Sequence, residues 1–212
     1  MNWPRILKPT PLPKGKQYRK WKEALAAESN HQCVYCAIPE NRFGGSWNFH
    51  VEHFRPKSRF GTLTHNYGNL YYACAICNVH KGDRWPGEPT RNLDSKTFIE
   101  PSIHDYNDNF KVNSLCHVKG ENTAACYTVE RVFLNRPQLI NERRISRLRL
   151  RRIACQQSIS DLVKLAGTRK SLRIQRALAR TLAAVLKIQA LEDSLAAERP
   201  YTPKDISRAA SA

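Results

Sequence analysis

The chain has 212 residues, of which 35 are Lys or Arg and 18 are Asp or Glu, giving a formal net charge of +17. A hydrophobic content of 41% with 25% charged residues excludes a wholly disordered chain. No apolar run reaches the roughly 20 residues of a membrane helix, and the basic, proline-rich start contains no apolar signal segment, so we expect a cytoplasmic protein without membrane contact. The positive charge indicates an anionic partner, with nucleic acid as the first candidate.

Short elements are predicted in the first part of the chain. After an extended arm over residues 1–17, the uninterrupted segment 18–28 predicts a helix. Residues 49–54 alternate in polarity and 69–73 are mostly apolar, so both segments predict strands, and 75–82 is typical of a helix start. This order predicts two strands followed closely by a helix.

The region that follows, 87–135, has no long periodic pattern. Residues 109–112 and 128–133 predict short strands within otherwise irregular structure. We therefore expect 87–135 to be a connecting region.

Two long helices are predicted after Asn135-Arg136-Pro137, a helix-start signal. The first covers 138–166 and the second 171–197, with Gly167-Thr168 between them. The expected apolar stripe of the second helix consists of Ile174, Leu178, Leu182, Val185, Ile188 and Leu191. We expect 136–212 to form a helical, strongly basic module.

Charge is concentrated in this module, because residues 136–190 carry +12 of the net +17. Their two acidic residues are too few to pair the arginines along a solvated helix face. The pattern favours contacts to nucleic-acid phosphates over docking to an acidic protein or a simple solvated face. The candidate phosphate contacts in this helix are Arg143, Arg144, Arg147 and Arg151.

Four of the seven cysteines form two C-x-x-C pairs, Cys33–Cys36 and Cys74–Cys77. Each pair can place two thiolates from one tight turn on a single tetrahedral ion, so two pairs can complete a structural zinc site. The alternative is a pair of buried or redox-active dithiols, which this spacing favours less. Cys116, Cys126 and Cys155 fall outside the pattern.

Between and just after the cysteine pairs lie Glu52-His53, Asn69 and Asn78. This order resembles the HNH endonucleases, whose fold is the ββα-metal, or His-Me, finger. The resemblance covers residues 31–86. It implies an α+β fold in which a zinc-stabilised ββα-metal finger follows an N-terminal arm and helix over 1–30 and precedes the C-terminal basic helical module.

The resemblance also implies a role for each of these residues in phosphodiester hydrolysis. His53 would take a proton from water, and Asn69 would tie the loop between the strands and orient His53. Glu52 and Asn78 would hold a catalytic Mg²⁺, or Mn²⁺ in its place, because hard cations prefer oxygen ligands. Many relatives carry Asp where this chain has Glu52.

Other polar residues near this motif have less defined roles. Arg55, Lys57 and Lys81 could contact phosphate, and Asp83 could be a further metal ligand or a helix cap. His50 lies outside the pattern and is expected to be structural or to face the substrate.

The complete chain resembles the HNH component of bacterial defence systems of the Septu-like or retron-associated kind, which accompanies an ATPase. The resemblance implies a metal-dependent endonuclease acting on DNA, or on RNA, with an ATPase partner. The alternative is a zinc-stabilised module that binds nucleic acid or protein and has a degenerate nuclease site.

Overall fold

The computed structural model describes residues 2–15, 17–89, 92–168 and 171–197. Residues 198–212 of the predicted basic module, and residues 1 and 16 of the predicted arm, lie outside this part. The chain divides into two compact units, residues 2–139 and the residues from Ile140 onward. Within the described ranges, no helix is long and apolar enough to cross a membrane.

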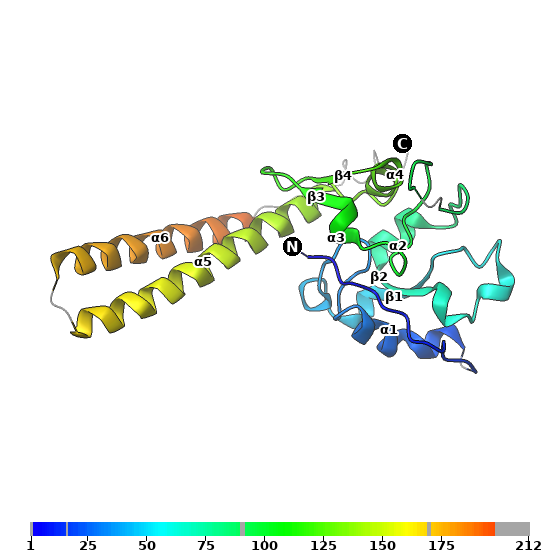
Figure 1. The fold of residues 1–212 in the computed structure, drawn as a ribbon, viewed down its shortest axis with the longest axis horizontal. Helices are drawn as coiled ribbons and strands as arrows, with labels where there is room; N and C mark the ends of the chain where they lie inside the picture. Colours follow the sequence, from blue (N-terminus) through cyan, green and yellow to red (C-terminus); the bar gives the residue numbers. More distant parts are fainter. Residues whose placement is uncertain (1, 16, 90–91, 169–170, 198–212) are drawn as a thin grey trace. The chain divides into compact units, whose positions relative to one another are not determined.

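The first unit is built around two antiparallel strands and the helix that follows them (Figure 1). Strand β1 (Phe49–His53) pairs with β2 (Leu70–Cys74) from Phe49 opposite Cys74 to His53 opposite Leu70. Every residue of β2 is buried, which explains its nearly continuous apolar sequence. Helix α2 (Ala75–Lys81) begins directly after β2, as the sequence predicted.

The long connection between β1 and β2 contains two single turns of 3-10 helix, η4 (Gly61–Leu63) and η5 (Tyr67–Asn69). This connection therefore consists of local turns, and β1 and β2 pair in register on either side of it. Two further turns, η2 (Glu40–Arg42) and η3 (Ser46–Asn48), precede β1.

The predicted N-terminal helix consists of a 3-10 turn, η1 (Tyr18–Trp21), continued by α1 (Lys22–Glu28). The arm before it is extended, but it packs on the core. Trp3 and Ile6 are buried, and the indole nitrogen of Trp3 donates to the carbonyl of Tyr35 at 2.9 Å. The arm is thus part of the first unit.

The connecting region contains more regular structure than the sequence predicted. It forms α3 (Tyr106–Asn109), the antiparallel pair β3 (Phe110–Val112) and β4 (Val118–Gly120), and α4 (Thr123–Arg131).

The strand predicted at 128–133 is wrong, because most of this segment belongs to α4. Its β-branched Thr128 and Val129 suggested a strand. Instead, the Asn122 side chain caps the helix by accepting from the backbone nitrogen of Ala125, and Ala124, Ala125 and Thr128 form its buried face. Capping and burial therefore override the local propensity.

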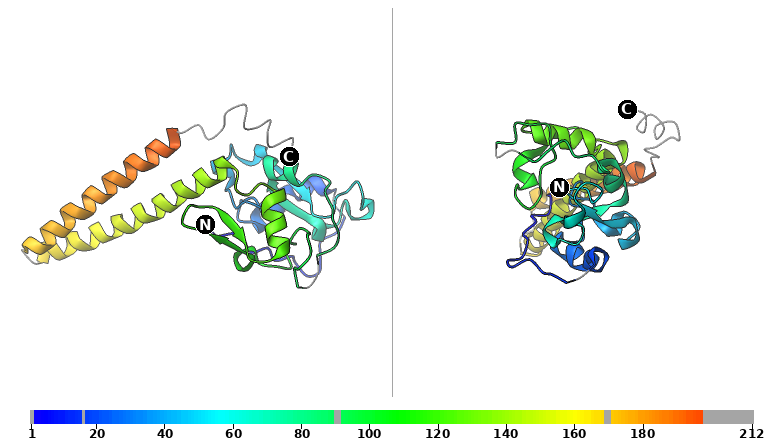
Figure 2. Two further views of the ribbon diagram at one scale, coloured as in Figure 1. Left: turned by 90° about the horizontal axis from the view of Figure 1, so that it is seen from above. Right: turned by 90° about the vertical axis from the view of Figure 1, so that its right-hand side faces the viewer.

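The second unit is a hairpin formed by α5 (Pro137–Thr168) from Ile140 onward and α6 (Leu172–Ala197), which lie antiparallel and side by side (Figures 1 and 2). The Asn141 amide donates to the carbonyl of Leu195 at 2.8 Å. Arg152 pairs with Glu192 at 3.2 Å, and the Glu192 side chain is only 7% exposed. This ion pair fixes the register of the two helices.

The stripe predicted for the second helix is partly wrong. Leu182 and Leu191 are 47% and 54% exposed, whereas Glu192 is buried against α5. A hydrophobicity pattern alone would not place a carboxylate at the seam, because it cannot anticipate the partner Arg152. The pairing between helices therefore decided which side of α6 is covered.

Candidate active site and metal centre

The four cysteines of the two C-x-x-C pairs meet in the interior of the first unit. Cys33, Cys36, Cys74 and Cys77 are fully buried, and their sulfur atoms all lie within 4.8 Å of one another. A tetrahedral zinc site with bonds of about 2.3 Å needs sulfur separations of about 3.8 Å. The observed Cys36–Cys74 separation of 3.9 Å fits this requirement. The cluster can hold a zinc ion.

Local backbone structure explains how the two pairs converge. The turn carrying Cys33 and Cys36 is bonded to β2, since the backbone nitrogen of Val34 donates to the carbonyl of Tyr72 at 2.9 Å. Cys74 ends β2 and Cys77 lies in the first turn of α2. A metal at this cluster would therefore join the turn, the strand and the helix.

Arg136 contacts the same four-sulfur cluster. Its guanidinium nitrogens lie 3.4 Å from the sulfur of Cys77, 3.8 Å from that of Cys74 and 3.9 Å from that of Cys36. Burial works against the cationic form of Arg136, but the neighbouring cysteines outweigh it and raise its pKa above the usual value. Four thiolates around a zinc ion would carry a net charge of −2, which Arg136 would partly balance.

We expect Arg136→Met to lower zinc affinity by about 10–100-fold, the usual effect of removing a residue that supports metal ligands. Competition with a chromophoric chelator would measure this affinity. Arg131→Met is the matched control, because Arg131 lies in α4 with its guanidinium over the ring of Tyr127. Equal affinity in both variants would contradict this role for Arg136.

His53, at the end of β1, is held in one orientation. Its Nε2 lies 3.0 Å from the carbonyl oxygen of Thr64. A carbonyl only accepts, so Nε2 carries the hydrogen, and the lone pair of the neutral ring is on Nδ1. Burial lowers the pKa of His53, and the nearby cations Lys57 and Lys81 lower it further, against the opposing hydrogen bond to Thr64. The ring is therefore suited to accept a proton near neutral pH.

Glu52 is buried beside two donors. Its Oε1 lies 2.7 Å from the ammonium of Lys81 and accepts from the Tyr35 hydroxyl at 3.3 Å. Burial raises the pKa of Glu52, while Lys81 opposes that shift. Among the described residues, none donates to Oε2. The second oxygen can thus act as a ligand.

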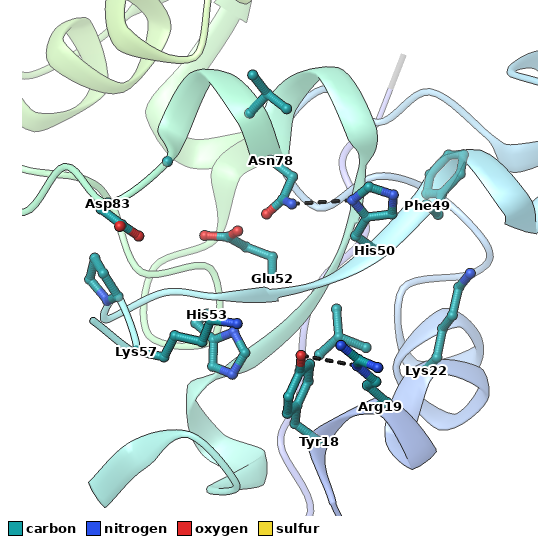
Figure 3. Close-up of a pocket in the computed structure, with 14 residues that line it drawn as sticks. Tyr18, Arg19, Lys22, Phe49, His50, Glu52, His53, Lys57, Asn78 and Asp83 are labelled. Atoms are coloured by element: carbon teal, nitrogen blue, oxygen red, sulfur yellow. Dashed lines mark hydrogen bonds between the residues drawn. The ribbon is translucent and has the colours of Figure 1, made fainter. Parts of the chain in front are cut away.

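Asn78, in α2, faces Glu52 across a pocket of about 640 Å³ (Figure 3). Its amide nitrogen donates to Nδ1 of His50 at 3.3 Å. This bond turns the amide oxygen toward the carboxylate of Glu52, and Asp83 approaches the same space. Three oxygen-bearing side chains therefore line one end of the pocket, the donor type that Mg²⁺ prefers.

These oxygen donors form a looser set than the sulfurs. Within the described ranges, the four cysteines are the one tight group of metal-binding side chains. A cation beside Glu52 and Asn78 would therefore need water or substrate oxygens to complete its coordination, which is usual for Mg²⁺.

Asn69 lies behind the pocket. Its side chain accepts from the backbone nitrogen of Arg55 at 2.8 Å and donates to the carbonyl of the same residue at 3.0 Å. These two bonds hold the chain where it leaves β1, immediately after His53. Asn69 therefore holds the backbone next to His53 and is not among the residues that line the pocket.

Comparison with known proteins agrees with this geometry. Residues 33–84 match the family model for the HNH endonuclease. Residues 33–84 form an HNH domain. The chain is also 32% identical over 124 residues to the Septu protein PtuB of Bacillus thuringiensis, a match that covers 57% of this chain and 42% of the relative. No solved structure matches the chain significantly.

Two of the predicted phosphate contacts in and beside the HNH domain need correction. Lys81 is fully buried, and its ammonium donates to the carbonyl of His53 at 2.9 Å and pairs with Glu52. Arg55 is engaged by two carboxylates, with Glu88 at 2.7 Å and Glu100 at 3.3 Å. Lys81 therefore contacts Glu52 and the His53 backbone from the protein interior. Arg55 links the loop after β1 to Glu88 and Glu100.

Lys57 is different, because it is exposed and lines the pocket. In the second unit, Arg144 and Arg151 are exposed and Arg147 is half-buried, whereas Arg143 is only 3% exposed. The predicted phosphate contact of Arg143 is therefore wrong, because a buried guanidinium cannot reach a ligand.

Three residues that the sequence did not predict as site residues line the pocket from outside the HNH domain. Tyr18, Arg19 and Lys22 belong to η1 and the start of α1. The three basic residues Arg19, Lys20 and Lys22 lie close together in the sequence and could have indicated a phosphate contact. Only the fold shows that this helix start lies against β1.

Proposed function

We propose that this chain is a metal-dependent HNH endonuclease that hydrolyses phosphodiester bonds, with DNA as the favoured substrate over RNA. The observation that carries this proposal is the arrangement of His53 beside three oxygen donors in one pocket. Its imidazole has a fixed tautomer with Nδ1 unprotonated, and Glu52, Asn78 and Asp83 line the same space. A domain that only binds nucleic acid would not require a histidine base together with three oxygen donors.

The residues have separate tasks in this mechanism. His53 accepts a proton from the attacking water at Nδ1, while its Nε2–H continues to donate to the carbonyl oxygen of Thr64. Glu52 and Asn78 would hold Mg²⁺, with Mn²⁺ as a substitute. The bound ion would stabilise negative charge on the scissile phosphate and the leaving oxygen. Lys81 holds both the Glu52 carboxylate and the backbone of His53.

We further propose that the protein acts in a bacterial defence system together with an ATPase. The support is the identity to the Septu protein PtuB. The matched segment covers 42% of that relative, so the defence role and the ATPase partner belong to the proposal. The strongly basic second unit would supply either nucleic-acid contacts or a surface for the partner.

Metal-dependent nicking of supercoiled plasmid tests the proposed function. We expect cleavage with Mg²⁺ or Mn²⁺ and none with EDTA. Asn78→Ala should reduce the rate by about 10²–10³-fold, because it removes a group that stabilises charge in the transition state. The assay is run with the chain alone and with a candidate partner ATPase.

The second candidate function is a zinc-stabilised nucleic-acid-binding module with a degenerate nuclease site. The observation that favours it is the 2.7 Å ion pair between Lys81 and Glu52, since a built-in cation already neutralises the carboxylate. Absence of cleavage under every condition, combined with retained DNA binding, would support this candidate and reject the nuclease.

A further inference from the structure

We propose that η1 and the start of α1, which precede the HNH domain, form a phosphate-binding subsite for the nucleic-acid strand. The subsite consists of Arg19 and Lys22, together with Lys57 from the loop after β1. The inference rests on the proposed function, because it assigns a path to the strand whose phosphodiester bond is cleaved.

Acidic and basic side chains lie at different ends of the pocket. In the view of Figure 3, Glu52, Asp83 and Asn78 lie on the α2 side of β1, whereas Arg19, Lys22 and Lys57 lie toward η1. Glu52 and Asp83 are the acidic residues among those described as lining the pocket. One end is therefore suited to a cation and the other to an anion.

Tyr18 connects the cationic end to the candidate base. Its ring meets that of His53 edge-on, with centroids 4.8 Å apart. The ammonium of Lys57 lies 5.4 Å from the centre of the same ring, and Nε of Arg19 donates to its hydroxyl at 3.1 Å. Two cations and His53 thus surround one aromatic side chain.

The cations keep free hydrogen-bond donors. Arg19 uses only Nε on Tyr18 in the described contacts, so the two terminal nitrogens of its guanidinium remain. Lys22 donates to the carbonyl of Ser46 at 2.7 Å, and an ammonium has three hydrogens. Both residues can bind phosphate oxygens without breaking these contacts.

The ligand chemistry follows from the spacing of charge along a nucleic-acid strand. Every nucleotide adds a phosphate, so a scissile phosphate beside His53 places its neighbours toward the ends of the pocket. The end beside η1 offers cations to such a neighbour, whereas the cation that Glu52 and Asn78 would hold faces the scissile phosphate itself. The strand therefore runs across η1 rather than along Arg55 and Lys81.

DNA binding in the His53→Ala background, which prevents cleavage, tests the subsite. The double variant Arg19→Gln/Lys22→Gln should weaken binding of a labelled oligonucleotide at least about tenfold in fluorescence anisotropy. The slope of log affinity against log salt should become shallower by about 1.4–1.8, the contribution of two phosphate contacts. The single variant Arg19→Gln, at an exposed position, should show about half of the slope change.

The matched control is Lys14→Gln/Lys20→Gln, which removes the same charge from one exposed residue of the arm and one of η1, both outside the pocket. It should bind within about twofold of the parent. Equal affinity in the two double variants would overturn the subsite, even if the wild-type chain cleaves DNA. Conversely, a clear difference in binding without any wild-type cleavage would support the subsite and reject the proposed nuclease activity.

Discussion

His53→Ala should reduce plasmid cleavage by about 10²–10⁴-fold, the range typical for loss of a general base. The reason is that Nδ1 of His53 is the nitrogen left free by the hydrogen bond from Nε2 to Thr64. DNA binding should remain near the wild-type level, because the substitution leaves Arg19, Lys22 and Lys57 in place. Single-turnover cleavage and anisotropy together separate these effects.

His65→Ala is the matched control for this experiment. His65 is exposed and stacks on Tyr18 with centroids 6.0 Å apart, but it does not line the pocket. Its removal should change the cleavage rate by less than about threefold. If both histidine variants cleave as fast as the wild type, His53 is not the base.

The pH dependence follows from the lowered pKa of His53, which burial causes first and the nearby lysines reinforce. Below this pKa the imidazole is protonated and cannot accept a proton, so cleavage should rise with pH. Above it the base is already neutral and the rate should level off, so the midpoint of the rise should lie below the usual histidine value of about 6.5. This rise should be absent from the residual activity of His53→Ala.

The second large effect concerns the four-cysteine cluster. Cys77→Ser, or exhaustive chelation, should abolish the cooperative unfolding transition of the first unit. Zinc binding contributes about 10–16 kcal/mol in zinc-finger peptides. That range reaches or exceeds the usual net stability of a domain, about 5–15 kcal/mol. Elemental analysis should find about one zinc ion per wild-type chain and less in the variant.

Cys126→Ser is the control, because Cys126 is exposed and lies outside the cluster. This variant should keep its zinc, and its free energy of unfolding should lie within about 0.5 kcal/mol of the wild-type value. A Cys77→Ser protein that retains a wild-type melting curve would show that the sulfurs are not a structural metal site.

Local sequence patterns were sufficient for the ββα core. The alternation at 49–54 and the apolar run at 69–73 correspond to β1 and β2, and the two C-x-x-C pairs converge as their spacing predicted. These features are local or recur at fixed spacing, so they can be read without knowledge of the fold.

Other properties depended on contacts between distant segments. Lys81 was predicted to contact phosphate because lysine side chains are usually exposed. The fold instead buries it against Glu52 and the backbone of His53. Arg136 seemed part of a helix-start signal, yet it contacts sulfurs far along the chain. A single sequence does not reveal which partner neutralises a charge.

The sequence by itself therefore determined which four cysteines form the cluster, the ββα order and the Glu52-His53 pair. The tertiary structure alone decided the tautomer of His53, the burial of Lys81 and the approach of Arg19 and Lys22 to the pocket. The physical reason is that spacing along a strand or helix fixes local geometry, whereas burial and electrostatic pairing arise only when separate segments pack together.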